Sequence, residues 1–190
     1  RRQRQMCIRD RVNEENIPAE GRYIFASNHP LGGLDGICLS AIIGGRFDGK
    51  IRYLVNDLLL YLSNLRSIFV PINKHGAQGK KNAELIEKAY ASDNQIITFP
   101  AGLCSRKQNG KIQDTEWKKS FIQKAVEYRR DIVPVFFEGR NSNFFYRLAN
   151  MRKALGIKDE LRNDLPARRD VQKQAQDCLL YTSPSPRDRQ

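Results

Sequence analysis

The residues best placed to do chemistry are a histidine and an aspartate within the segment Asn28-His29-Pro30-Leu31-Gly32-Gly33-Leu34-Asp35-Gly36. The proline and the two adjacent glycines permit a tight turn, which can bring the two side chains together. A histidine held by a carboxylate can accept a proton from a hydroxyl group near neutral pH, which is general-base chemistry. His29 and Asp35 are therefore the candidate catalytic pair.

The flanking sequence predicts that this pair lies between a strand and a helix. Residues 23–27 form an apolar run typical of a buried strand, and residues 37–43 are typical of the opening of a helix. Further strands are predicted at 51–55, 67–72, 95–99 and 132–137, and further helices at 57–62, 80–92, 115–130 and 144–155. This alternation predicts an α/β fold with a central mixed, mostly parallel sheet flanked by helices on both faces. Pro71 predicts an edge position for its strand.

The two ends of the chain are expected not to belong to the folded protein. Residues 1–11 and 178–188 resemble translated sequencing adapters, so they are set apart from fold reasoning. We expect a single domain over residues 12–176, a metagenomic fragment of a longer chain, between disordered adapter-like segments at 1–11 and 177–190.

Charge and cysteine content narrow the class of partner. The net charge of the chain is +12, of which residues 1–11 carry +4 and residues 178–190 carry +1, so +7 remains. A basic balance favours anionic partners such as phospholipid head groups, phosphorylated substrates or nucleic acid. Cys38 and Cys104, outside the two ends, are too few and too far apart for a disulfide framework or a zinc site, so we expect no metal and a reducing compartment.

Four segments, in order, resemble motifs of the glycerolipid (lysophospholipid) acyltransferase superfamily, which includes lysophosphatidate acyltransferase. They are Asn28-His29 with Asp35, residues 67–74, residues 99–106 and residues 132–135. They are similar, in turn, to the family's Asn-His-x4-Asp, Phe-Ile-x-Arg, Phe-Pro-Glu-Gly-Thr-Arg-Ser and Val-Pro-Val motifs. Three departures are visible: five residues separate His29 from Asp35, the basic residue of the second motif is displaced to Lys74, and Ala101 replaces a glutamate. These differences resemble a bacterial subgroup of hemolysin-like and ornithine-lipid-type acyltransferases.

The resemblance implies transfer of a fatty acyl group from acyl-CoA or acyl carrier protein to a hydroxyl of a lyso-lipid, either lysophosphatidate or a lyso-amino-acid lipid, in bacterial membrane lipid synthesis. It implies no cofactor besides this acyl donor. His29 would act as general base, and Asp35 would orient it and stabilise the imidazolium. Backbone N–H groups near Gly32-Gly33 or Gly102 would stabilise the oxyanion. The implied substrate-binding residues are Asn73, Lys74, Gly102, Ser105 and Arg106.

The resemblance also implies a peripheral protein on an anionic membrane surface, at the cytoplasmic face of the bacterial inner membrane. The first candidates for membrane contact are residues 58–62 and 144–146, with Arg147, Arg152 and Lys153 nearby. Nucleic acid is not expected as a partner, because most aromatic residues lie in apolar strands and helices instead of along a basic stripe.

Two alternative functions remain open at this level. One is a non-catalytic basic lipid-binding module with the same fold, and the other is a different class of His/Asp acyltransferase with a His-x3-Asp-Gly motif. For the remaining polar residues the structural interpretation is favoured. His75 is expected at the surface, and Asp114, Glu116 and Trp117 are expected to begin a helix, in preference to binding the acceptor.

Overall fold

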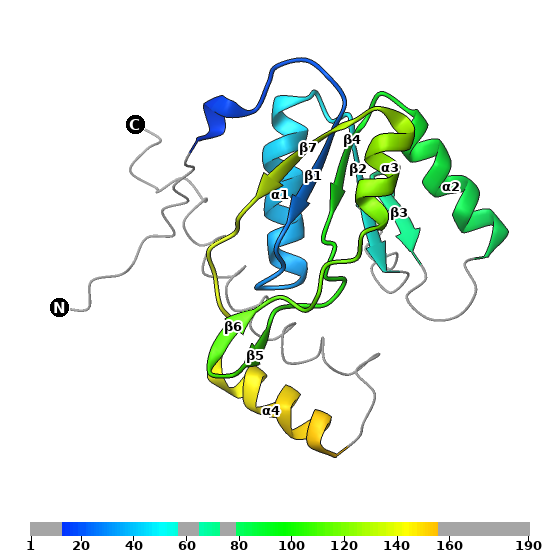
Figure 1. Cartoon of the computed structure of the whole chain (residues 1–190). Helices are drawn as coiled ribbons and strands as arrows, with labels where there is room; N and C mark the ends of the chain where they lie inside the picture. Colours follow the sequence, from blue (N-terminus) through cyan, green and yellow to red (C-terminus); the bar gives the residue numbers. More distant parts are fainter. Residues whose placement is uncertain (1–12, 57–64, 73–78, 156–190) are drawn as a thin grey trace, which may run out of the picture.

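The computed structural model describes residues 13–56, 65–72 and 79–155 (Figure 1). Its main sheet has the strand order β3-β2-β4-β1-β7, and all neighbouring strands in it are parallel. The strands are β1 (Tyr23–Ser27), β2 (Ile51–Asn56), β3 (Phe69–Ile72), β4 (Gln95–Thr98) and β7 (Asp131–Val135). The predicted α/β fold is confirmed, and the main sheet is wholly parallel over the described strands. β3 lies at an edge of the sheet, as Pro71 predicted.

Helices cover both faces of this sheet (Figure 1). The helices involved are α1 (Gly33–Arg46), α2 (Lys80–Ala91) and α3 (Ser120–Tyr128). Successive residues of a strand point to opposite faces, so β1 contributes to two separate cores. Phe25 packs with Ile43 of α1 on one face. Ile24 packs with Tyr90 of α2 and Phe121 of α3 on the other.

A β-hairpin and a fourth helix extend from the sheet. The hairpin pairs β5 (Arg106–Gln108) with β6 (Lys111–Gln113) in antiparallel register. Asn109 and Gly110 join the two strands with φ values of +48° and +80°, as a two-residue mirror-image turn requires. α4 (Asn143–Ala154) contributes Phe145 and Tyr146 to a small core with Cys104 and Ile112. The sequence did not predict the hairpin, and α3 begins at Ser120, five residues later than the predicted helix.

Several sequence predictions lie outside the described residues. They are the helix at 57–62, the candidate residues Asn73 and Lys74, His75, and the two adapter-like ends. A short 3-10 turn at Glu14–Asn16 precedes β1. None of the helices described here has the length and apolar character needed to cross a bilayer.

Candidate active site

His29 lies immediately beyond the carboxyl end of β1, at the sheet edge where ligands of parallel α/β sheets bind. β1 is hydrogen-bonded to β4 on one side and to β7 on the other, with Ala26 aligned to Thr98 and Ser27 to Val135. This register brings the turn after β4 beside the histidine. The ring centroids of His29 and Phe99 are 4.3 Å apart.

Asp35 reaches His29 from the first turn of α1. Its Oδ1 lies 3.0 Å from Nδ1 of His29, whose side chain is 15% exposed, whereas Asp35 is completely buried. The contact has the distance of an ion pair, but it does not have the geometry of a regular hydrogen bond. Catalytic hydrogen bonds are often poorly aligned without substrate and tighten when it binds. The structure therefore brings the predicted pair together and leaves Nε2, the other ring nitrogen, unengaged by Asp35.

The turn between the two residues accommodates the extra residue of the motif. Gly32 has φ +83°, and a Cβ on it would lie 2.8 Å from Sγ of Cys104, so glycine is required there. Oδ2 of Asp35 accepts the backbone N–H groups of Leu31 at 3.0 Å and of Gly32 at 3.2 Å. The aspartate thus fixes the turn that leads to it.

Tyr53 of β2 lies beneath the start of α1. A Cβ on Gly36 would lie 2.7 Å from Cζ of Tyr53 and closer still to its hydroxyl, so the glycine makes room for the tyrosine. Burial, followed by the charge of Asp35, raises the pKa of the Tyr53 phenol well above its usual value. Tyr53 therefore stays protonated and neutral where a histidine changes its charge.

Long-range hydrogen bonds hold the loop that carries His29. The side-chain amide of Asn28 donates to the carbonyl of Phe137 at 2.9 Å and accepts its N–H at 2.6 Å, which continues the pairing of β1 with β7. Nδ2 of Asn141 donates to the carbonyl of Pro30 at 2.8 Å. These contacts hold Asn28 and Pro30, the residues on either side of His29, so the path of the loop is defined.

The other predicted site residues that the structure describes lie in the segment after β4. Ser105 is 3% exposed, and its N–H donates to the carbonyl of His29 at 2.7 Å. Gly102 has φ +68° and donates its N–H to the carbonyl of Phe99 at 2.9 Å. Arg106 donates to the carbonyl of Cys104 at 2.8 Å. The guanidinium of Arg106 also lies 5.3 Å from the centre of the Phe145 ring, so its described contacts are with its own segment and with α4.

Two of the three predicted oxyanion donors are already engaged. The N–H of Gly32 bonds to Asp35, and the N–H of Gly102 bonds to a carbonyl. Gly33 is the first residue of α1, and N–H groups of a helix's first turn have no partner within the helix. Gly33 is therefore the remaining candidate donor.

Comparison with known proteins identifies the family. A family model described as "Acyltransferase" matches residues 9–170. The chain belongs to this acyltransferase family. It is 59% identical over 144 residues to a lyso-glycine lipid O-acyltransferase of Bacteroides thetaiotaomicron, covering 76% of this chain and 53% of that protein. A protein of the same name from Phocaeicola vulgatus is 57% identical, with 76% and 52% covered. The chain thus spans about half the length of these curated relatives. No solved structure matches it.

Sequence reasoning assigned Asp114 to the start of a helix and missed its contact with His29. Asp114 lies in the loop between β6 and α3, and its carboxylate accepts the backbone N–H of His29. The sequence had predicted a helix beginning beside it. The available signal was Asn109-Gly110, which is typical of a hairpin and would have placed Asp114 opposite Ser105.

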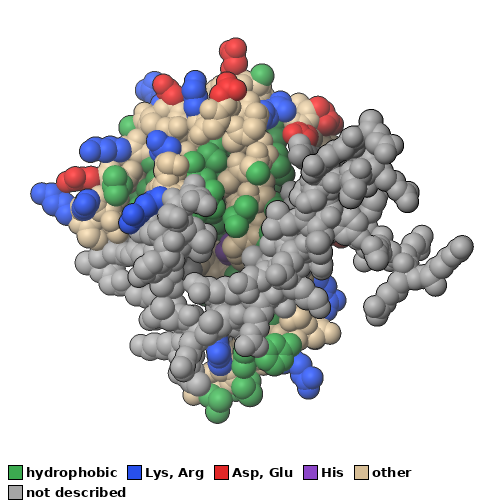
Figure 2. All heavy atoms as spheres, turned by 180° about the vertical axis from the view of Figure 1, so that it is seen from behind, with side chains coloured by type: hydrophobic (Ala, Val, Ile, Leu, Met, Phe, Trp, Pro, Cys, Tyr) green, Lys and Arg blue, Asp and Glu red, His purple; other side chains and the backbone are tan. Residues whose placement is uncertain are grey.

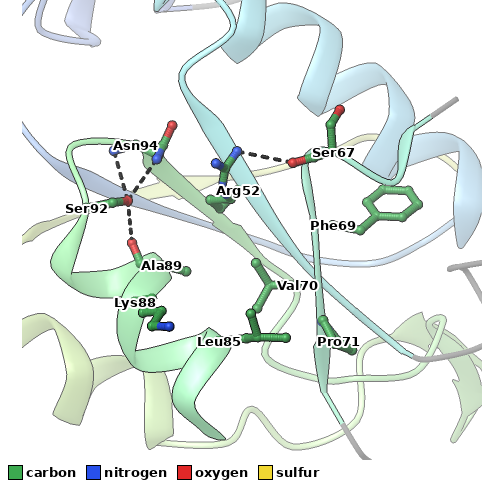
Figure 3. A pocket seen from close by; sticks show the side chains of 10 residues that line it. All are labelled: Arg52, Ser67, Phe69, Val70, Pro71, Leu85, Lys88, Ala89, Ser92 and Asn94. Carbon is green, nitrogen blue, oxygen red and sulfur yellow. Dashed lines mark hydrogen bonds between the residues drawn. The ribbon is translucent and has the colours of Figure 1, made fainter. Parts of the chain in front are cut away.

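A pocket of about 310 Å³ lies elsewhere on the chain, between β2, β3 and α2 (Figure 3). Arg52 donates to the carbonyl of Ser67 at 3.3 Å on one side of it, and Ser92 bonds to Asn94 on the other. Arg52 is near the amino end of β2, and Asn94 immediately precedes β4. Because the strands are parallel, this pocket lies towards their amino ends, whereas His29 lies at their carboxyl ends. The pocket is therefore not part of the His29–Asp35 site.

Proposed function

We propose that this acyltransferase transfers a fatty acyl group to the hydroxyl of a lyso-lipid with an amino-acid head group. The observation that carries the proposal is the 3.0 Å contact between His29 and the buried Asp35 at the carboxyl edge of the sheet. Of the two acceptors that the sequence resemblance implied, the lyso-amino-acid lipid is favoured, because both relatives are named lyso-glycine lipid O-acyltransferases.

The proposed reaction is a direct transfer with no covalent enzyme intermediate. The acceptor hydroxyl donates its proton to Nε2 of His29 as its oxygen attacks the thioester carbonyl of acyl-CoA or acyl carrier protein. The buried carboxylate of Asp35 stabilises the imidazolium that forms. The N–H of Gly33 is the proposed donor to the oxyanion. The tetrahedral intermediate then expels the thiolate, which takes the proton from the imidazolium, so the products are an ester and a free thiol.

We further propose peripheral attachment to the cytoplasmic face of the bacterial inner membrane through α4. Two apolar side chains of this helix and one immediately after it are more than half exposed: Phe144 at 65%, Met151 at 53% and Leu155 at 65%. Arg147 is exposed on the same helix. Figure 2 shows hydrophobic side chains gathered at the lower end of the molecule, where α4 lies, with Lys and Arg beside them. An apolar face with adjacent cations suits an anionic lipid surface.

The test uses the purified full-length protein that contains this domain. Labelled acyl-CoA and acyl carrier protein are supplied in turn, with lyso-glycine lipid or lysophosphatidate as acceptor. We expect ester formation with lyso-glycine lipid, and a loss of turnover of about 10²–10⁴-fold in His29→Ala, the range attributed to general-base catalysis. The melting temperature of His29→Ala should stay close to that of the wild type.

Asp35→Asn and Asp48→Asn form a matched pair of variants. Both changes remove one carboxylate charge, but Asp48 is exposed in the turn after α1. Only Asp35→Asn should lose turnover. Wild-type turnover in folded His29→Ala would refute the general-base role, and binding of lyso-lipid without turnover by the wild type would favour the lipid-binding module. Preference for lysophosphatidate would overturn the acceptor assignment alone.

A further inference from the structure

The carboxylate of Asp114 collects three hydrogen-bond donors next to the active site. Its two oxygens each lie 3.2 Å from the backbone N of His29. Oγ of Ser105 donates to Oδ1 at 2.5 Å, and Nε1 of Trp117 donates to Oδ2 at 3.0 Å. Bonds to a charged acceptor are stronger than bonds between neutral groups. Asp114 is therefore a rigid junction between three separate stretches of chain.

Two of these stretches are also bonded directly to each other. The N–H of Ser105 donates to the carbonyl of His29 at 2.7 Å. His29, Ser105 and Asp114 thus form a closed ring of hydrogen bonds in which both peptide groups of His29 are held. The hairpin sets this ring, because its register pairs Arg106 with Gln113 and so places the preceding Ser105 opposite the following Asp114.

We propose that Asp114 is a positioning residue for His29. It makes no contact with the imidazole that the structure records; it fixes the main chain from which the ring projects, while Asp35 and Phe99 fix the ring itself. Because its main chain and two neighbours of its ring are fixed, the imidazole of His29 has little freedom to turn away from the direction in which it accepts the proton. The inference rests on the proposed general-base role of His29.

Removing the carboxylate should therefore affect turnover more than substrate binding. In Asp114→Ala, we expect kcat to fall by about 10²-fold, since a displacement of roughly 1 Å at a catalytic group has that effect. We expect KM for both substrates to change by less than about threefold, because a positioning group contributes in the transition state. Asp114→Asn keeps an acceptor oxygen for His29, and its amide can donate to Ser105, but the charge that strengthens these bonds is lost, so kcat should fall by about tenfold, less than in Asp114→Ala.

A double-mutant cycle with His29→Ala separates positioning from a general structural role. If Asp114 acts through the imidazole, Asp114→Ala should leave the residual turnover of His29→Ala unchanged. If Asp114 only supports the fold, the residual turnover should fall by the same factor as in the wild-type background. Asp48→Asn is the control for loss of a carboxylate: it should match the wild type when introduced alone, and it should match His29→Ala when introduced into that variant.

The outcomes distinguish this inference from the function on which it rests. Full activity of His29→Ala would overturn the general-base role, and with it the positioning role. Loss of activity in His29→Ala with a normal kcat in Asp114→Ala, or with additive losses in the cycle, would overturn the positioning role alone. If Asp114→Ala fails to fold, the same cycle is run with the near-isosteric Asp114→Asn, for which a non-additive loss of kcat supports the proposal and an additive or absent loss overturns it.

Discussion

Replacing Gly36 by alanine tests whether the packing beneath the His29–Asp35 pair sets its geometry. An added Cβ would lie 2.7 Å from Cζ and 2.8 Å from Cε1 of Tyr53, closer than real Cβ contacts allow. The tyrosine cannot easily yield, because its ring is buried and lies 5.6 Å, centroid to centroid, from both Phe69 and Phe99. The first turn of α1 must therefore move, and Asp35 is the residue next to the substitution.

The expected effect combines two opposing contributions. Overpacking a core costs about 1–3 kcal/mol. Replacing a helical glycine by alanine returns about 0.5–1 kcal/mol. The net loss of unfolding free energy in Gly36→Ala should be about 0–2.5 kcal/mol, and displacement of Asp35 by roughly an ångström should lower kcat by about 10²-fold. Gly45 provides the matched control in the same helix, since a Cβ there meets nothing within 4 Å.

Urea unfolding at neutral pH and acyl transfer to lyso-glycine lipid measure the two effects. Gly45→Ala should be as active as the wild type and more stable by up to about 1 kcal/mol. The reasoning is refuted if Gly36→Ala and Gly45→Ala have the same stability and the same turnover. Loss of stability with normal turnover would show that Tyr53 supports the fold without setting the position of Asp35.

Two further predictions concern α4 and the contact between α2 and α3. Exchanging Phe144 and Met151 for serine should weaken binding to phosphatidylglycerol vesicles about tenfold or more in a sedimentation assay. Val126, which is 77% exposed on α3, provides the control, and Val126→Ser should not weaken binding. Equal losses in the two variants would contradict the role of α4. Hydrogen bonds from Lys124 and then Tyr128 lower the pKa of Glu87 below its usual 4.5, so its stabilisation is complete above that pH and is lost as the pH falls through the lowered value. Glu87→Gln should therefore cost less than about 1 kcal/mol at pH 7 and converge with the wild type at low pH in urea unfolding; a constant difference across pH would contradict this.

The parts of the fold that are local in sequence were predictable. Residues 23–27 are apolar throughout, as expected for a strand buried on both faces, and β1 occupies those residues. Pro71 cannot donate a ladder hydrogen bond, and its strand lies at the edge. The glycines between His29 and Asp35 indicated a tight turn, and the structure has one there. In each case the residue type itself limits the backbone or the burial.

The contacts that organise the site were not predictable in the same way. Asp114 and His29 are 85 residues apart, and only the hairpin and the sheet register bring them together. The hairpin strands are polar, so the alternation of hydrophobic residues that signals a strand is missing from 106–113. Ser105 illustrates the consequence: its motif suggested a substrate contact, whereas its hydroxyl is bonded to Asp114. The pairing of the buried Ser105 with the half-buried Asp114 depends on tertiary structure, which short motifs do not encode.

The position of the carboxylate, more than the length of the motif, decides whether the histidine can be supported. Asp35 lies in the first turn of a helix, and its Oδ2 accepts the N–H groups of Leu31 and Gly32, so the intervening turn closes onto the aspartate itself. A residue added to this turn changes its path without moving its ends, provided that a position such as Gly32 can take positive φ. Five intervening residues then place the carboxylate at 3.0 Å from the imidazole. In this chain the longer spacing is accommodated because Gly32 takes positive φ within the turn.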